Sequence, residues 1–471
     1  MLTIEDNIRE QSRINPYKTA LIDGASGKSV SYGKLWEEIL RAAYAFRSNG
    51  LKRGDRIVVA ATKSLEFVYR YFGAHEAGLI VAPVDSEINN TRLARIVDAV
   101  RPKIVIGLEW EGKLPDPTDI KPDRQDIADI LFTTGTTGAP KGVALSFANE
   151  AAAARNINQF IENTDKDVEL LALPISHSFG LGRLRCMLSI GATTVMLPSG
   201  FASMKKFFGT MEKYKVTGFG MVPASWAYIS KMSGDRITEF ADQLRYIEMG
   251  SAPLPASEKQ RIMDLLPHTK ICMHYGLTEA SRSTFLNFSA EKDMFDTAGK
   301  ASPNCKIAIF SDSGEELPAN HDGEVCVKGD HVCSGYWNVP TDQYEKDFFE
   351  GYFRTGDWGS IDKKGYLRLK SRTKEMINVG GKKVSPMEVE ETLLTIDGIT
   401  EAACVAKPDP LMGEVVKAFV VGTLTTADND NIIANISRKL ENYKIPAEIV
   451  HVDSLPRTES GKLQRLKLKD I

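Results

Sequence analysis

A short loop rich in threonine and glycine is the sequence feature that most restricts how this chain folds. Residues 131–142 read Leu-Phe-Thr-Thr-Gly-Thr-Thr-Gly-Ala-Pro-Lys-Gly. Glycines let the backbone close around a ligand, and hydroxyls, backbone N–H groups and a lysine bind phosphate oxygens. Residues 127–132 predict a buried strand, and a strand that leads into a glycine-rich turn is where α/β folds hold phosphate. The loop therefore indicates an α/β fold with a triphosphate site rather than a flexible surface loop.

This loop is not the common P-loop, which has the pattern G-x-x-x-x-G-K-[ST]. A proline precedes Lys141, a glycine follows it, and the hydroxyl groups lie upstream of it. We predict that the loop binds the β- and γ-phosphates of a nucleotide through Thr133, Thr134, Gly135, Thr136, Thr137, Gly138 and Lys141.

Composition and charge argue against several other classes of protein. The hydrophobic fraction is 42% and the charged fraction is 26%, as in soluble globular proteins. A net charge of -3 gives no electrostatic reason to expect a nucleic acid partner. The 6 cysteines form no C-x-x-C pair, which argues against zinc and fits free thiols. No secretory signal is present and no apolar run reaches the ~18 residues of a membrane span, so we expect a cytoplasmic protein.

The order of predicted elements indicates several domains. A chain of 471 residues is too long for one ordinary core. Short apolar runs, such as 56–61, 103–107, 194–198 and 217–222, alternate with helical stretches at 32–49 and 65–77 up to about residue 300, which predicts doubly wound α/β layers. Shorter alternating strands over about 303–373 predict a small β-rich subdomain, and the remainder predicts a compact α+β unit.

Further motifs follow downstream in a definite order. Tyr275–Glu279 offers an aromatic face, a hydroxyl and a carboxylate, and Asp357 follows a turn. Arg372, the pair Gly380–Gly381 and a polar segment that ends at Lys462 come later. Together with the loop, these motifs closely resemble the adenylate-forming superfamily, which contains acyl-CoA synthetases, amino-acid adenylation domains and firefly luciferase. The resemblance covers nearly the whole chain.

The resemblance implies a complete site for ATP and Mg²⁺. Glu279 is expected to reach the Mg²⁺ that bridges the phosphates, since magnesium needs only one or two carboxylates beside phosphate oxygens. Thr278 is expected to contact the α-phosphate, and Asp357 is expected to bind the ribose. Arg372 is expected to support either the ribose or a phosphate. The adenine is expected to lie between Tyr275, with its neighbour Gly276, and the strip formed by Gly250, Ser251, Ala252 and Pro253.

The resemblance also implies a moving C-terminal domain. A large domain, 1–373, and a small domain, 374–471, are expected to rotate about a hinge at Lys374. Lys462 is expected to touch the substrate carboxylate and the α-phosphate, while Gly380–Gly381 lines a thiol tunnel after rotation. His177 is expected to gate the acyl pocket or to shape its entrance, and Phe179 and Phe285 are candidates either for the pocket wall or for the core.

The predicted activity is an AMP-forming ligation of a small carboxylic acid to coenzyme A through an acyl-adenylate. One alternative is an acid-activating enzyme that loads a carrier protein. Another is an amino-acid adenylating enzyme, which is disfavoured because residues 171–191 contain no Asp or Glu to bind an ammonium group. A luciferase-like oxidative reaction and a non-enzymatic nucleotide sensor are further alternatives, and the intact Lys141, Glu279 and Lys462 argue against the sensor.

Two clusters of basic residues suggest finer contacts. Arg183, Arg185 and Arg282 stand in the segments that border the acyl pocket in the superfamily, where an arginine would suit a second acidic group on the substrate. The favoured interpretation is that these three arginines face solvent or make internal ion pairs. On the small domain, the candidates for a basic rim that binds the phosphates of coenzyme A are Lys382, Lys383, Tyr443 and Lys444.

Overall fold

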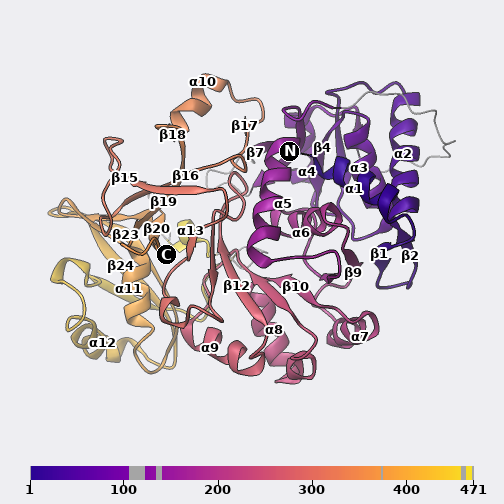
Figure 1. The fold of residues 1–471 in the computed structure, drawn as a ribbon. Coiled ribbons are helices and arrows are strands. Elements are labelled where there is room, and N and C mark those ends of the chain that lie inside the picture. Colours follow the sequence, from indigo (N-terminus) through magenta and orange to yellow (C-terminus); the bar gives the residue numbers. More distant parts are fainter. Residues whose placement is uncertain (1, 106–121, 134–140, 373–374, 458–462, 469–471) are drawn as a thin grey trace. The chain divides into compact units, whose positions relative to one another are not determined.

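The structure is a computed structural model that describes residues 2–105, 122–133, 141–372, 375–457 and 463–468. The chain forms two compact units, one of residues 1–307 and 327–353 and the other of residues 308–326 and 354–471 (Figure 1). The sequence predicts a boundary between a large and a small domain at 373/374, with a hinge at Lys374. This boundary stays a prediction, because residues 373 and 374 lie outside the described part. Within that part, no helix is long and apolar enough to cross a bilayer.

Two sheets form the first unit. Neighbouring strands β3 (Arg56–Ala60) and β4 (Ile80–Val84) are parallel, as the buried apolar runs predicted. The same holds for β8 (Val168–Leu171) with β9 (Thr193–Met196), and for β11 (Tyr246–Met249) with both β10 (Gly218–Met221) and β12 (Lys270–Tyr275). The nine-stranded sheet has the order β14 (Lys300–Ala301), β13 (Thr284–Asn287), β12 (Lys270–Tyr275), β11 (Tyr246–Met249), β10 (Gly218–Met221), β8 (Val168–Leu171), β9 (Thr193–Met196), β1 (Thr19–Asp23), β2 (Ser29–Ser31). The six-stranded sheet has the order β17 (Gly335–Tyr336), β7 (Lys141–Ser146), β6 (Ile127–Thr133), β4 (Ile80–Val84), β3 (Arg56–Ala60), β5 (Ile104–Val105).

Most longer helices of this unit begin at a side-chain cap. The side chains of Thr3, Ser31 and Ser64 accept hydrogen bonds from backbone N–H groups of the first turn, which satisfies donors that the helix leaves unpaired. The helices predicted over 32–49 and 65–77 are α2 and α3. The helices of the unit are α1 (Ile4–Ile14), α2 (Tyr32–Ser48), α3 (Leu65–Glu76), α4 (Asn90–Val100), α5 (Phe147–Ile161), α6 (Ser178–Ser189), α7 (Met204–Tyr214), α8 (Pro223–Ser233), α9 (Ala256–Leu265) and α10 (Thr341–Tyr344).

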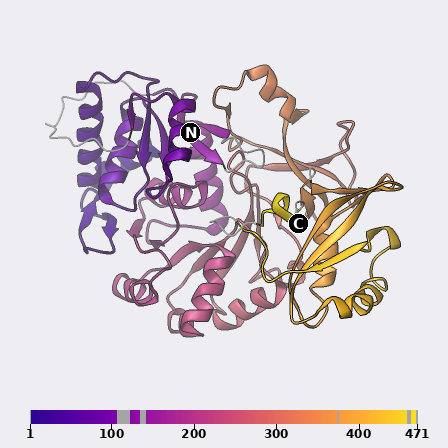
Figure 2. The same cartoon turned by 180° about the vertical axis from the view of Figure 1, so that it is seen from behind.

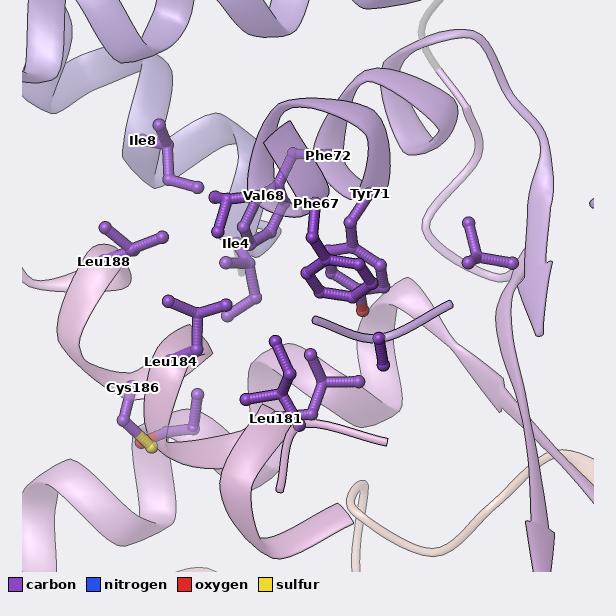
Figure 3. Close-up of a cluster of buried hydrophobic side chains, with 14 of the residues drawn as sticks. Ile4, Ile8, Phe67, Val68, Tyr71, Phe72, Leu181, Leu184, Cys186 and Leu188 are labelled. Atoms are coloured by element: carbon purple, nitrogen blue, oxygen red, sulfur yellow. The ribbon is translucent and has the colours of Figure 1, made fainter. Parts of the chain in front are cut away.

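The main hydrophobic core lies where helices from distant parts of the sequence meet. Views from both sides show the magenta helices α5 and α6 next to each other (Figures 1 and 2). Side chains of α1, α3 and α6 converge in the close-up of this core (Figure 3). Burial of these apolar side chains stabilises the packing of α6, which begins directly after His177.

Two smaller sheets follow along the chain. One has the order β15 (Lys306–Phe310), β16 (Gly323–Lys328), β19 (Tyr352–Ile361), β18 (Phe348–Phe349), and β20 (Leu367–Arg372) also pairs with β19. The last has the order β22 (Lys382–Val384), β21 (Ile377–Val379), β24 (Gly413–Gly422), β23 (Ile399–Asp409), and β25 (Glu448–His451) also pairs with β24. Three helices accompany this sheet: α11 (Pro386–Leu393), α12 (Asn429–Ile436) and α13 (Arg465–Leu468). These elements confirm the predicted β-rich segment and the α+β end of the chain.

Candidate active site

The two ends of the threonine-glycine loop lie opposite each other on neighbouring strands. Thr133 ends β6 and pairs with Lys141, which begins β7, in an antiparallel ladder. The loop is therefore a strand-to-strand connection, unlike the strand-to-helix turns that hold phosphate in doubly wound folds. Predictions for Thr134, Gly135, Thr136, Thr137 and Gly138 lie outside the described residues.

Lys141 and Glu279 are brought together by a residue that sequence reasoning missed. The Nζ atom of Lys141 lies 4.5 Å from the centroid of the Tyr336 ring. The Tyr336 hydroxyl donates to Oε1 of Glu279 at 3.1 Å. Burial and the Glu279 carboxylate raise the pKa of Tyr336, so its hydroxyl keeps the proton that it donates. The only sequence signal was an unassigned Gly-Tyr pair at 335–336, which becomes β17 and pairs with β7.

The predicted metal and α-phosphate residues stand on a tight turn after β12. Leu277 N–H donates to Ala280 O at 3.1 Å, and Ala280 N–H donates back to Leu277 O at 3.2 Å. A Cβ on Gly276 would clash with the backbone of residues 280 and 282, so this position requires glycine. Thr278 and Glu279 are half-buried on this turn. The Glu279 carbonyl accepts from the backbone N–H of Cys333 at 2.7 Å, which fixes the turn against the segment that leads into β17.

The predicted adenine strip follows the strand next to β12. Because β11 and β12 are parallel neighbours, Gly250 and Tyr275 lie at the same sheet edge. A Cβ on Gly250 would overlap the His274 ring, so glycine is required for this close packing. Ser251 has φ 74, in the left-handed region, and Ser251, Ala252 and Pro253 are exposed. The structure thus brings the strip and Tyr275 to one edge, while their contact with adenine stays a prediction.

The predicted acyl-gate residue stands at the start of a helix. His177 is the N-cap residue of α6, and its side chain makes no capping hydrogen bond. Phe179 contacts the His274 ring edge-on at 4.7 Å between centroids, and Phe285 stacks on Phe160 at 4.3 Å. Both phenylalanines are buried, which supports the core alternative.

All three candidate substrate-binding arginines are buried in internal ion pairs. The Nε atom of Arg183 donates to Glu169 at 2.8 Å, and Arg185 pairs with Asp129 and Glu150. Arg282 pairs with Glu248 at 3.0 Å. The favoured interpretation is therefore confirmed, and these guanidinium groups give no support to recognition of a second acidic group.

A second buried polar cluster is formed by two side chains of α3 with Glu5 and Asp129. His75 contacts Glu5 through Nδ1 at 2.7 Å and Asp129 through Nε2 at 3.2 Å. Asp129 also accepts from the Tyr71 hydroxyl at 2.8 Å. Burial alone would lower the pKa of His75, but hydrogen bonds with Asp129 and Glu5 raise it to about 10. This histidine is therefore charged at neutral pH and contributes to folding stability.

The second compact unit brings the predicted ribose residues together. Asp357 on β19 pairs in register with Arg372 on β20, and Arg372 Nε lies 2.8 Å from Asp357 Oδ1. The Asp357 side chain is largely buried, and its backbone N–H donates to Thr355 Oγ1 at 3.1 Å. The sheet thus fixes the carboxylate next to a cation. Contact with a ribose stays a prediction.

The small unit also holds the predicted basic rim. Lys383 pairs with Asp312 at 2.8 Å, and Lys444 pairs with Glu388 at 2.6 Å, so carboxylates neutralise both lysines. Lys382 instead lies over the Tyr443 ring at 4.6 Å from its centroid. The predicted catalytic Lys462 and hinge Lys374 lie outside the described residues.

The described residues suit a magnesium ion that is bound mainly by phosphate. Among them, no group of three or more His, Cys, Asp or Glu side chains forms a metal site. Glu279 offers a half-buried carboxylate next to the Lys141–Tyr336 pair. Because Mg²⁺ usually keeps several waters and takes one or two carboxylates beside substrate phosphates, this donor set fits it.

Comparison with known proteins identifies the family. The family of AMP-binding enzymes matches residues 8–119 and 107–337, and the AMP-binding enzyme C-terminal domain matches residues 388–462. An oxalate–CoA ligase of Arabidopsis thaliana is 30% identical over 93% of this chain and 93% of its own. The long-chain-fatty-acid–CoA ligase FadD13 of Mycobacterium tuberculosis is 26% identical over 98% of this chain and 97% of its own.

Solved structures agree with this family. The ATP-bound MatB of Rhodopseudomonas palustris has a TM-score of 0.89 and 27% identity, covering 100% of this chain and 99% of its own. The o-succinylbenzoate CoA synthetase of Bacillus subtilis in complex with an acyl-adenylate has a TM-score of 0.84 and 25% identity, covering 99% of this chain and 98% of its own. The chain therefore belongs to the AMP-binding enzyme family, within the adenylate-forming superfamily, and is an acid–thiol ligase of the acyl-CoA synthetase type.

Proposed function

We propose that Lys141, Thr278 and Glu279 bind the triphosphate of ATP while a carboxylic acid attacks its α-phosphorus, and that coenzyme A then displaces AMP from the acyl-adenylate. The observation that carries this proposal is the convergence of Lys141, Tyr336 and Glu279. These residues come from β7, β17 and the turn after β12. They provide a cation, a hydroxyl and a carboxylate within one group of contacts.

Electrostatics explains why adenylation needs this group. Attack by a carboxylate on a phosphate brings two anions together and places further charge on non-bridging oxygens. A positioned cation stabilises that charge, and loss of one such preorganised donor costs about 3–4 kcal/mol of transition-state stabilisation. Lys141 provides a cation at the start of β7, and we propose that Lys462 provides another during adenylation.

A metal ion completes the charge balance in this proposal. Glu279 would hold Mg²⁺, which neutralises phosphate charge when it is bound. The Tyr336 hydroxyl occupies one carboxylate oxygen of Glu279 and so fixes the side chain in one orientation. Tyr336 therefore acts on the metal residue and, through its ring, on Lys141.

Coenzyme A is the acceptor that we favour over a carrier protein. All of the relatives named above whose names state an acceptor are CoA ligases. Lys382, held over the Tyr443 ring, is the residue that we assign to the phosphates at the nucleotide end of coenzyme A.

Pyrophosphate release across a panel of acids tests the proposal. The panel contains oxalate, a cinnamate, a succinylbenzoate and fatty acids of several chain lengths. Each acid is assayed with and without coenzyme A. We expect a single-turnover burst of pyrophosphate with the preferred acid alone, and sustained turnover with AMP release when coenzyme A is added. Turnover that depends on an acid but never on a thiol would contradict the proposal that coenzyme A is the acceptor.

Matched variants test the residue assignment. Glu279→Gln should slow adenylation, whereas Glu239→Gln, which removes an exposed carboxylate that pairs with Arg236 at 3.2 Å, should not. Equal rates for both variants would refute the role of Glu279.

A further inference from the structure

One buried carboxylate lies among three segments of the candidate active site. Glu248 on β11 is 0% exposed. Its Oε1 atom lies 3.0 Å from Arg282 Nε and 2.7 Å from His274 Nδ1, and its Oε2 atom lies 3.3 Å from Arg183 Nη1. Burial alone would raise the pKa of Glu248, but Arg282, His274 and Arg183 lower it below its usual value. Glu248 is therefore a buried anion that lies within 3.3 Å of two arginines, on α6 and on the turn after β12, and of a histidine ring on β12.

Arg282 connects this anion to the start of α6. Its Nη1 atom donates to the Ser178 carbonyl and its Nη2 atom to the Phe179 carbonyl, both at 3.0 Å. These are the first two residues after His177. The guanidinium carbon also lies 4.7 Å from the centroid of the Phe179 ring. The planar guanidinium group of Arg282 has donors in fixed directions and thus determines the position of the first turn of α6 relative to β11.

Arg282 also ends the turn that carries Thr278 and Glu279. Its backbone has φ 54, a left-handed conformation that is strained for a residue with a side chain. Such a conformation persists only where surrounding contacts hold it, and the guanidinium contacts described above do so. The turn is consequently anchored at its far end by the same residue that anchors α6.

His274 forms the second connection to Glu248. It directly precedes Tyr275, and its ring fills the space above Gly250. The strip after β11 and the start of the Tyr275–Glu279 segment therefore pack on a ring that contacts the same carboxylate.

We propose that Glu248 and Arg282 form a positioning pair for adenylate formation, which holds His177, the Thr278–Glu279 turn and the strip after β11 in one mutual arrangement. This inference rests on the proposed roles of Thr278 and Glu279. Stability alone does not require such a pair, because well-packed apolar residues replace buried ion pairs at little or no cost. Apolar packing is not directional, whereas the hydrogen bonds that Arg282 donates fix the position of α6 relative to the turn.

Removal of the guanidinium group is the direct test. Arg282→Gly keeps the left-handed backbone accessible while it deletes the side chain. We expect the rate of ATP–pyrophosphate exchange to fall roughly tenfold to a hundredfold, the scale of a small displacement of reacting groups. The fall should be in kcat, together with a rise in the KM for ATP. Added guanidinium chloride at non-denaturing concentration should restore part of the activity, and Arg282→Lys should be intermediate.

A matched control separates positioning from stability. Asp167→Asn breaks the ion pair between Asp167 and Arg245, whose atoms lie 2.6 Å apart next to the opposite end of β11. This variant should lower the melting temperature with little change in exchange rate. If Arg282→Gly does not fold, Glu248→Gln, which preserves shape, takes its place and should show the same loss of exchange without the rescue.

Two further measurements distinguish the inference from its alternatives. Thioester formation from a synthetic acyl-adenylate and coenzyme A should be much less affected, because that step needs no triphosphate. ATP binding with Mg²⁺, measured by calorimetry, should weaken in Arg282→Gly but not in Asp167→Asn. Normal exchange per folded molecule, or equal loss in both half-reactions without guanidinium rescue, would overturn the inference. A Glu279→Gln variant with normal exchange would instead refute the proposed role of Glu279, independently of the pair.

Discussion

The hydroxyl of Tyr336 offers the sharpest test of the candidate active site. Tyr336→Phe removes one hydrogen bond of 3.1 Å to the Glu279 carboxylate and leaves the ring beneath Lys141. Hydrogen bonds to charged groups contribute about 1.5–3 kcal/mol. Because Tyr336 and Glu279 are both half-buried, we expect the lower end of this range.

This magnitude converts directly into a rate. A loss of about 1.4 kcal/mol corresponds to about tenfold in rate if the hydrogen bond orients Glu279 in the transition state. Tyr336→Leu also removes the cation–π contact with Lys141, which contributes about 0.5–1 kcal/mol at an exposed site, and should be slower still. The assay is ATP–pyrophosphate exchange at several Mg²⁺ concentrations, and the Mg²⁺ concentration needed for half-maximal rate should rise in both variants.

Tyr344→Phe is the matched control. Its hydroxyl donates to the Cys333 carbonyl at 2.7 Å, in the segment beside β17, and has no contact with Glu279. This variant should lose about 1 kcal/mol of unfolding free energy and keep its exchange rate. Wild-type exchange in Tyr336→Phe, or an equal fall in Tyr344→Phe, would refute the reasoning.

Three further predictions concern stability, acceptor and motion. Because the folded pKa of His75 is about 10 against an ordinary value of 6.5, its contribution to stability is full below pH 6.5 and is lost as the pH rises through about 10; urea titrations should show a steeper alkaline loss in wild type than in His75→Gln. Lys382→Ala should raise the KM for coenzyme A but not for pantetheine, and an equal effect on both thiols would exclude a phosphate contact. Lys462→Ala should slow adenylation roughly a hundredfold and spare thioester formation from a synthetic acyl-adenylate. Lys374→Pro should do the reverse, since a locked φ obstructs rotation, and equal damage to both steps in both variants would contradict a two-state scheme.

Local patterns in the sequence predicted most elements and the contiguous motifs. The apolar runs at 56–61 and 217–222 became β3 and β10, because a buried parallel strand needs apolar side chains on both faces. The Tyr275–Glu279 motif was visible because its function depends on neighbours in the chain. Only the structure shows why its second residue is glycine, because Gly276 approaches the backbone of residues 280 and 282 too closely for any Cβ.

Contacts between distant segments were decided only by the tertiary structure. Tyr336 lies beside Lys141 because β17 pairs with β7, and no local sequence pattern predicts that pairing. The arginines of α6 are equally ambiguous in sequence, because Arg183 finds Glu169 and Glu248 on strands β8 and β11. A guanidinium group binds a substrate or an internal carboxylate with the same chemistry. Which one it meets depends on which anion the folded sheet buries within reach, and a buried charge must be paired.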